Sequence, residues 1–333
     1  MILVTGATGF IGSNLLYELA KYNVCNIVAT YRYKSNKDKI AALFRSKFPD
    51  GNLKFERIIW RKAELRDLPS LTEAFEGVKK VYHCAAFISF AFSDRQKLYE
   101  INQKGTSYIV DLCLKNKIEK LVYVSSIASL GSEENETTVD ENSTWDNNID
   151  KTPYGYSKYG AEMEVWRGSQ EGLDIAIVNP GIVLGPGSPM EKKIKYMKYW
   201  FRFYTPGISG YVWVEDVITI MIKLMDSGIK SERFALVAEN WSGKSMTLAL
   251  LKAQKKNYTV IKISKVFFYI FWFVEYLLEI IGLRKRFFTK ALIKIIFNDT
   301  KISGEKIKSY IDFKYTPIGL SLKKLNLDKN IAY

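Results

Sequence analysis

The first half of the chain alternates short apolar runs with longer stretches whose apolar residues recur every three or four positions. The apolar runs are typical of strands buried on both faces, and the longer stretches, clearest at residues 13–21 and 94–117, are typical of amphipathic helices. The predicted strands are Ile2–Val4, Asn26–Tyr31, Leu53–Ile59, Val78–Ala86 and Lys120–Val124. Regular alternation of strand and helix predicts an α/β fold with a doubly wound parallel sheet.

The second half has one further predicted strand, Leu173–Val178, and then two unusual stretches. Residues 196–204 are strongly aromatic, which favours either core packing or an apolar wall over a substrate. Three phenylalanines after the fourth strand could line the same pocket; they are Phe87, Phe90 and Phe92.

The most apolar stretch is Val266–Leu283, which raises the question of a membrane. A spanning helix needs about 20 apolar residues, whereas this one carries Glu275 and Glu279 on a stripe with Trp272 and Tyr276. The pattern is amphipathic, so a helix packed in the second lobe is expected. The alternative is peripheral binding at a membrane surface, helped by basic residues that follow; these are Arg284, Lys285, Arg286, Lys290 and Lys294.

Composition and charge narrow the class of protein. The 333 residues, 47% hydrophobic and 25% charged, suit a folded soluble protein. The three cysteines have no paired spacing, and the fold begins at Met1 without a preceding targeting segment, so we expect a cytoplasmic protein. The single histidine, His83, makes a zinc or Ser-His-Asp site improbable. From Asn240 onward there are 18 Lys and Arg against 6 Asp and Glu, a net charge of +12, but no nucleic-acid-reading motif accompanies it.

The first predicted strand runs directly into a glycine-rich turn and a helix. Such glycines permit a tight turn and let backbone N–H groups approach a pyrophosphate, which the helix N-terminus favours. A purely structural glycine turn is the alternative, but the strand, turn and helix together are the context that a dinucleotide site requires. The candidate cofactor-binding residues here are Gly6, Thr8, Gly9, Phe10, Ile11 and Gly12.

The end of the second predicted strand bears on the choice of cofactor. NAD sites usually place an acid here for the ribose 2′-hydroxyl, whereas an arginine suits a 2′-phosphate. This chain has Arg32, followed by Lys34, Lys37 and Lys39. We therefore expect NADP, with NAD possible and a solvated basic loop as the alternative explanation. Glu64 and Leu65 are placed to meet the adenine, and Ala85 and Ala86 are small enough for the backbone to pass close to a cofactor.

Tyr154 and Lys158 are four residues apart in a predicted helix, so their side chains share one face. A neighbouring cation favours the phenolate and makes a tyrosine a better acid or base. The spacing alone is weak, because an exposed helix face would also produce it. Its chemical interpretation depends on the cofactor motifs upstream.

These motifs occur in the order found in the extended short-chain dehydrogenase/reductases, and the chain resembles that superfamily over most of its length. The matching stretches are 5–12, 83–86, 102–106, 124–126, 154–158, 179–181 and 211–217. The superfamily includes NAD(P)-dependent epimerases and dehydratases, and also dihydroflavonol-reductase-like and hydroxysteroid-dehydrogenase-like enzymes. The resemblance implies a Rossmann domain at 1–178 and 211–237, with a discontinuous substrate lobe at 179–210 and 238–333.

By this resemblance, Tyr154 is the catalytic acid/base, and Lys158 binds the nicotinamide ribose and lowers the pKa of the tyrosine. Ser126 holds the substrate oxygen, with Ser125 as its stand-in, and Asn102 is a structural residue. Pro180 joins the cofactor-binding set.

The chain also departs from its relatives at three places. Glu64 replaces a common Asp, and residues 127–129 lack the acidic pair of dehydratases. Residues 209–211 lack the Arg that many nucleotide-sugar epimerases carry. Dehydratase activity is therefore improbable.

The expected reaction is hydride transfer between NADP(H) and a carbonyl or secondary alcohol of a small molecule. A nucleotide-sugar epimerase with retained cofactor is the alternative, and a cofactor-sensing module without catalysis is a third possibility. The resemblance also implies a homodimer through helices 94–117 and 156–168. The side chains expected at that interface are Ile109, Leu112, Val165 and Trp166.

Overall fold

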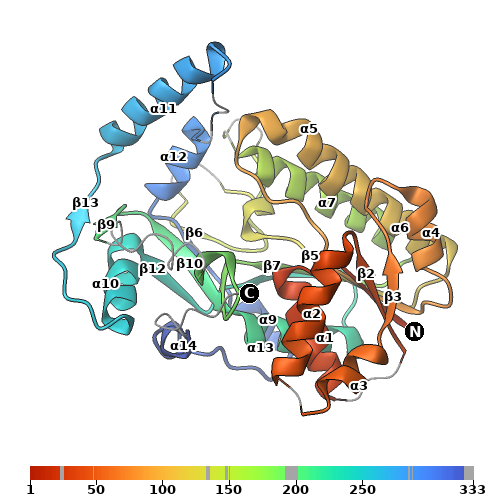
Figure 1. Ribbon diagram of the computed structural model, residues 1–333. Helices are drawn as coiled ribbons and strands as arrows, with labels where there is room; N and C mark the ends of the chain where they lie inside the picture. Colours follow the sequence, from red (N-terminus) through yellow and green to blue (C-terminus); the bar gives the residue numbers. More distant parts are fainter. Residues whose placement is uncertain are drawn as a thin grey trace.

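A parallel sheet of seven strands forms the centre of the molecule (Figure 1). The computed structural model describes residues 1–22, 26–47, 49–132, 136–146, 149, 151–191, 202–283, 286 and 288–325. Every pairing within this sheet is parallel, and the strand order is β11-β7-β5-β4-β1-β2-β3. The strands are β1 (Ile2–Thr5), β2 (Ile27–Tyr31), β3 (Ile59–Lys62), β4 (Lys80–His83), β5 (Lys120–Val124), β7 (Ile175–Pro180) and β11 (Glu232–Leu236). The predicted doubly wound parallel sheet is confirmed.

Helices cover both faces of this sheet, and successive residues of a strand point to opposite sides. On β1, Val4 packs into the cluster that contains Leu16 of α1 and Met221 of α9. Leu3 packs into the opposite cluster, with Val110 of α6 and Val165 of α7. Burial on both faces explains why these strands read as continuous apolar runs. The helices of this part are α1 (Phe10–Lys21), α2 (Lys34–Lys47), α3 (Gly51–Glu56), α4 (Leu68–Ala74), α5 (Arg95–Leu98), α6 (Gly105–Lys115), α7 (Pro153–Gln170) and α9 (Val214–Asp226).

The third predicted strand, Leu53–Ile59, is wrong. Most of that stretch is helix α3, and strand β3 begins only at its last residue. Phe55 on α3 packs its ring 5.9 Å from that of Phe44 and 5.2 Å from that of Trp60. Tertiary packing of this aromatic cluster overrides the local alternation of apolar and polar residues.

The long predicted helix 94–117 is divided in the structure. After a single turn (Phe92–Asp94), α5 leads into a π-helical segment, Tyr99–Lys104, before α6 begins. π-Helical segments are rare and frequently occur at functional sites. This one carries Asn102, whose contacts are described with the site.

Beyond the central sheet, the chain builds a smaller sheet in the order β12-β10-β8. Its strands are β8 (Ile182–Leu184), β10 (Ile208–Trp213) and β12 (Glu239–Ser242). With α10 (Gly243–Ala253) and α14 (Ile318–Lys324), they enclose a separate core that includes Trp213, Leu250 and Leu322. The chain then returns to the central sheet, where Ile307 of α13 (Lys306–Tyr310) and Tyr315 join the core shared with α1.

Two short strand pairs complete the fold. Strand β13 (Ile261–Lys262) pairs with β9 (Phe203–Tyr204), and β14 (Lys301–Ile302) pairs with β6 (Thr138–Val139). Most of the aromatic stretch 196–204 lies outside the described residues, so its expected role is not tested. Cys84 and Cys113 are free thiols, and Cys25 lies outside the described part of the chain.

Helix α11 (Lys265–Ile280) contradicts the expectation of a helix packed within the second lobe. It projects at the edge of the molecule, beside α12 (Lys290–Ile296), and Glu275 is its one buried residue (Figure 1). Among the described residues, no helix combines the length and the apolar character needed to cross a bilayer. The helix is therefore a long, exposed and largely apolar element at the edge of the molecule.

Candidate active site

The glycine-rich turn between β1 and α1 approaches the end of β4 closely. Gly6 has a φ of +65°, and a Cβ at this position would lie 2.6 Å from the backbone N of Ala85. Only glycine satisfies both conditions without strain. The N–H of Gly9 donates to the carbonyl of Gly6 at 2.9 Å, and Gly9 is the N-cap of α1, so the helix N-terminus opens at this turn. The geometry fits a bound pyrophosphate.

A cavity of about 280 Å³ lies at the carboxyl ends of β1, β2, β3 and β4. Eight of the predicted cofactor-binding residues line it: Gly6, Thr8, Gly9, Arg32, Glu64, Leu65, Ala85 and Ala86. Ligands of open parallel sheets bind at this edge. These residues and the open end of α1 therefore form a cradle of suitable chemistry for a dinucleotide.

The remaining predicted residues of the turn do not line this cavity. Phe10 and Ile11 are half-buried and pack against the core under α1. Gly12 is buried at the start of α1, and Pro180 is buried at the end of β7, beside Leu236. Sequence analysis also missed several lining residues that lack a charge or a glycine signature; these are Thr5, Thr30, Asn36, Cys84 and Ile101.

Of the basic residues after β2, only Arg32 lines the cavity. It is exposed, and its guanidinium lies 4.8 Å from the ring centroid of Tyr33. Lys37 is turned elsewhere, with its ammonium 5.6 Å from the Tyr31 ring and 5.7 Å from the Trp60 ring. Glu64, the predicted adenine contact, accepts hydrogen bonds from Arg66 at 3.0 and 2.7 Å.

The two serines after β5 have different environments. The hydroxyl of Ser125 is buried and donates to the Glu162 carboxylate at 2.7 Å. Ser126 is half-buried, and its hydroxyl accepts a hydrogen bond from the N–H of Ala128 at 3.2 Å. Ser125 is therefore occupied in the protein interior, and Ser126 is the serine that can face a ligand.

Tyr154 begins α7 beside Ser126 and is 9% exposed. Burial raises the pKa of its phenol to about 12, and a hydrogen bond with Ser126 opposes that rise. The ring of Phe90 packs edge-on at 5.7 Å between centroids. In the protein alone the pKa of Tyr154 is therefore raised, whereas the resemblance implied a lowered pKa.

Lys158 lies one turn further along α7 and is almost completely buried. Its ammonium donates to the Tyr123 hydroxyl at 2.7 Å and to the Val124 carbonyl at 2.8 Å. Burial lowers the pKa of this lysine to about 7, against an opposing effect of the Glu162 carboxylate. The lysine is therefore held against β5, one turn of α7 away from Tyr154.

Glu162 continues the same face of α7, and sequence analysis missed it. Its side chain is completely buried, with one carboxylate oxygen accepting from Ser125, Ser129 and Asn179 at 2.7–2.8 Å. The other oxygen forms an ion pair with Arg233 at 3.0 Å. The network ties α7 to the loop after β5. Extending the i, i+4 spacing of the tyrosine and lysine by one more turn would have identified this glutamate.

Asn102 fixes the chain on the other side of α7. Its amide bonds both backbone groups of Phe87, at 2.7 and 2.9 Å, and donates to the Ser157 hydroxyl at 2.9 Å. A structural role was expected for this residue, and these contacts give it one: the π-helical segment holds the cavity wall and α7 together.

His83 is also structural. It is fully buried between the hydroxyls of Thr5 and Thr106, at 2.6 and 3.0 Å, and burial lowers the pKa of its ring to about 3. The imidazole is therefore neutral throughout the physiological range. In the described part of the chain, no cluster of three or more His, Cys, Asp or Glu side chains could hold a metal ion.

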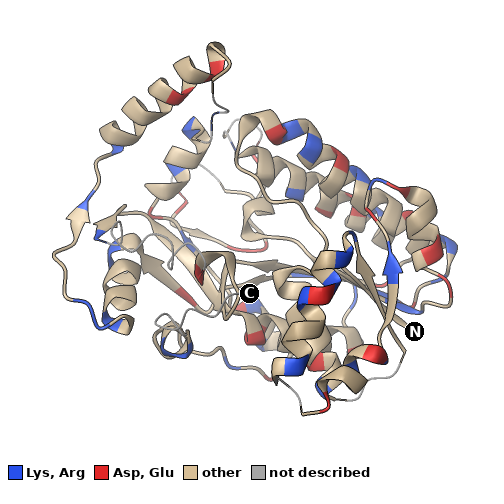
Figure 2. Cartoon of the chain, viewed as in Figure 1, with Lys and Arg blue, Asp and Glu red and all other residues tan. Residues whose placement is uncertain are grey.

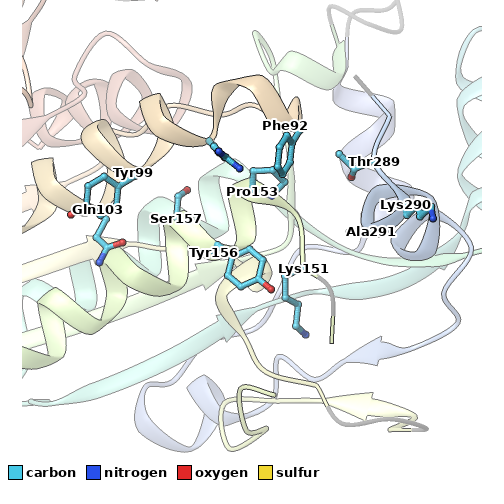
Figure 3. A pocket seen from close by; sticks show the side chains of 11 residues that line it. Phe92, Tyr99, Gln103, Lys151, Pro153, Tyr156, Ser157, Thr289, Lys290 and Ala291 are labelled. Atoms are coloured by element: carbon cyan, nitrogen blue, oxygen red, sulfur yellow. The ribbon is translucent and has the colours of Figure 1, made fainter. Parts of the chain in front are cut away.

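A second cavity, of about 390 Å³, lies between α5, the start of α7 and α12 (Figure 3). Its lining includes Phe92, Tyr156 and Lys290, but neither Ser126 nor Tyr154. The three phenylalanines expected to share one pocket are therefore separated. Phe87 lines the cofactor cavity, Phe90 contacts Tyr154 and Phe92 lines this second cavity.

The expected dimer interface is wrong in most of its residues. Ile109, Leu112 and Val165 are buried in the protomer's own core, while Trp166 is only half-buried. Helices α6 and α7 turn these side chains toward the sheet and each other. Homodimerisation itself stays a prediction, with Tyr99 of the π-helical segment and Tyr156 of α7 exposed at the surface.

Comparison with known proteins agrees with this architecture. Residues 2–236 match the family model described as the NAD dependent epimerase/dehydratase family. The chain is similar to "Sterol demethylase protein B" of Methylococcus capsulatus, with 31% identity over 72% of this chain and 70% of that protein. It is also similar to a "Putative dihydroflavonol 4-reductase" of Synechocystis, with 34% identity over 55% of this chain and 49% of that protein. The crystal structure of gox2253 superposes with a TM-score of 0.78 at 23% identity, covering 98% of this chain and 96% of that one.

Proposed function

This chain belongs to the NAD-dependent epimerase/dehydratase family, and from that premise we propose that it transfers hydride between NADP(H) and a carbonyl or secondary alcohol of a small molecule. The observation that supports this best is the pairing of Ser126 with Tyr154. The Ser126 hydroxyl offsets part of the rise in the Tyr154 pKa that burial causes, and Ser126 follows β5 at the sheet edge that carries the cofactor cradle.

When bound, NADPH would supply the hydride that reduces the carbonyl carbon of the substrate. Ser126 donates a hydrogen bond to the carbonyl oxygen and orients it. Tyr154 donates its phenolic proton to the same oxygen, which becomes the hydroxyl of the product. The oxidative direction reverses each step, with Tyr154 accepting the proton.

Lys158 has two roles in this proposal. Its ammonium would hold the nicotinamide ribose, and its positive charge would stabilise the Tyr154 phenolate. Because Tyr123 and Val124 already hold the ammonium at 2.7 and 2.8 Å, the lysine is pre-positioned under the site. Glu162 keeps the neighbouring Ser125 turned inward, so that Ser126 is the serine presented to substrate.

We further propose that the cofactor is NADP rather than NAD. Arg32 supports this, because it is the basic residue at the end of β2 that lines the cavity, where a ribose 2′-phosphate is bound in such sheets. The lobe formed by residues 179–210 and 238–333 would hold the substrate.

Two features favour a reductase over the other activities of the family. Residues 127–129 form a short turn without a carboxylate, and the nearby Glu162 is enclosed and paired with Arg233. This site therefore offers no free carboxylate of the kind that a dehydratase uses to eliminate water. Ser209 and Gly210 lie within β10, paired with Trp241 and Asn240 of β12, where many nucleotide-sugar epimerases place an arginine. The similarity to a putative dihydroflavonol 4-reductase points the same way.

The experiment that tests the proposed reaction follows the fate of the cofactor. We expect the purified protein to consume NADPH in the presence of an apolar ketone or aldehyde from a panel, with stoichiometric alcohol formation and loss of the NADPH absorbance. A protein that purifies with tightly bound cofactor, and converts a nucleotide sugar without net change in that absorbance, would instead be an epimerase.

A further inference from the structure

Helix α11 is amphipathic in an inverted sense, with its apolar side facing outward. Its outer face, defined here as Val266, Phe267, Ile270, Phe273, Val274, Leu277, Ile280 and Ile281, consists of exposed apolar residues spaced three or four apart. Val266, Ile270 and Ile280 are 65%, 60% and 63% exposed. In a surface helix of a soluble protein, the apolar side normally faces the core. A continuous exposed patch of this kind marks a binding surface.

The polar side of α11 faces the body of the protein. The carboxylate of Glu275 is buried and accepts a hydrogen bond from the N–H of Phe288 at 2.9 Å. Glu279 pairs with Arg286 at 3.3 Å. Both acids of the helix are therefore turned inward, and the outer face carries no negative charge.

Aromatic contacts hold the helix in this orientation. The rings of Phe268 and Phe271 each lie 5.5 Å from that of Phe288, and the guanidinium of Arg286 lies 5.5 Å from the ring of Tyr276. Lys290, on α12, places its ammonium 4.9 Å from the ring of Trp272. The inner side is thus a packed and charge-compensated surface, so a simple rotation that buried the outer face would break these contacts.

The surroundings of the helix are basic. Exposed lysines lie before its first turn and on the neighbouring helix; they are Lys262, Lys265, Lys290 and Lys294. Figure 2 shows α11 mostly uncharged, with positively charged residues at its lower end and on α12. The segment from Asn240 onward carries 12 of the 14 net positive charges of the chain.

We propose that the outer face of α11 docks on an anionic lipid bilayer, with its axis in the plane of the surface and Lys262 and Lys265, at its N-terminal end, on the lipid head groups. The sixteen residues of the helix rise about 24 Å, short of the 30 Å hydrocarbon thickness of a typical bilayer, so it lies on the membrane rather than across it. Charge decides between this occupant and a second copy of the chain. Two copies would bring together lobes of the same strong positive charge, whereas an anionic surface attracts them.

The proposal is tested by sedimentation of the full-length protein with lipid vesicles of two compositions. We expect binding to phosphatidylcholine vesicles that contain phosphatidylserine, much weaker binding to phosphatidylcholine alone, and a loss of binding as salt is raised. The double variant Ile270→Asp/Leu277→Asp should lose roughly tenfold or more of this binding, because both carboxylates would have to enter the interface.

Leu320→Asp is the matched control, since it places the same charge on an exposed leucine of α14 in the same lobe. It should bind vesicles like the parent, and circular dichroism should show that all three proteins are folded. Failure of the parent to bind either vesicle, equal binding to both compositions, or unchanged binding of the double variant would each overturn the proposal. A parent dimer that ignores vesicles and becomes monomeric in the double variant would show that a second copy covers this face instead.

Discussion

At the scale of single residues, burial controls the chemistry of the site. Burial raises the pKa of Tyr154 to about 12 and lowers that of Lys158 to about 7. Both shifts disfavour the charged form, as desolvation must. The tyrosine thus stays protonated until a cation approaches, and the positively charged ring of an oxidised nicotinamide would be such a cation. A bound oxidised cofactor would therefore lower the pKa of Tyr154 in addition to accepting hydride.

Lys158 should leave a signature in the pH dependence of stability. Between its folded-state pKa of about 7 and its ordinary value of 10.5, only the unfolded chain holds the proton. Raising the pH through this window therefore favours the folded state, with a contribution approaching about 1.4 kcal/mol per pH unit. Lys158→Met should remove this contribution from urea-unfolding curves measured without cofactor.

The control for that measurement is Lys244→Met, which removes an ammonium from an exposed position of α10. It should keep the parental slope. If Lys158→Met and the parent gained stability equally over this window, the ammonium would not be desolvated as described.

Arg32 should determine the choice between the two nicotinamide cofactors. The parent is expected to bind NADPH more tightly than NADH, because a guanidinium–phosphate contact is a charge-assisted hydrogen bond. Arg32→Ala should erase most of that preference, a loss of about 2 kcal/mol or more than tenfold in affinity for NADPH alone. Fluorescence titration of both cofactors measures it.

Lys34→Ala is the comparison for Arg32→Ala, since Lys34 is also exposed but does not line the cavity. Its cofactor preference should match the parent. Equal affinities of the unmutated protein for NADPH and NADH would contradict the assignment.

At the scale of elements, the sequence predicted best those elements whose local residue pattern directly reflects their burial or their backbone conformation. The strand from Lys120 to Val124 was predicted with its observed bounds, because four consecutive apolar residues, Leu121–Val124, follow Lys120 and are buried. The turn at Gly6 was also predicted correctly, because glycines at this spacing are required for a tight turn and a close backbone approach. Eight of the residues predicted around the cofactor meet at one cavity for the same reason.

Elements decided by distant contacts were not predictable from local pattern. The stretch from Leu53 was read as a strand, but the rings of Phe44 and Trp60 hold it as helix α3. The spacing from Lys158 places Glu162 on the same helix face, but its enclosure by Arg233 and Ser125 depends on residues distant in the sequence. For α11, the sequence predicted an amphipathic helix, but it did not predict which side of the helix would face the protein.

At the scale of the whole molecule, the central sheet and the remaining chain carry different features. The parallel sheet gathers the cofactor cradle and the Ser126–Tyr154 pair at one edge. The remaining chain carries most of the positive charge and the exposed helix α11. The second cavity connects the two, because it is lined both by Pro153 next to the catalytic candidate and by Lys290 on α12, beside α11 (Figure 3).

The central claim is that Tyr154 moves the proton that accompanies hydride transfer. The most direct test is the rate of NADPH consumption by Tyr154→Phe with a carbonyl substrate found in the panel, alongside Tyr156→Phe. The second variant removes the same oxygen two residues away, from an exposed side chain of the same helix. Tyr154→Phe should bind NADPH normally and turn over at least about 100-fold more slowly, while Tyr156→Phe keeps the parental rate. Turnover by Tyr154→Phe at the parental rate would contradict the mechanism.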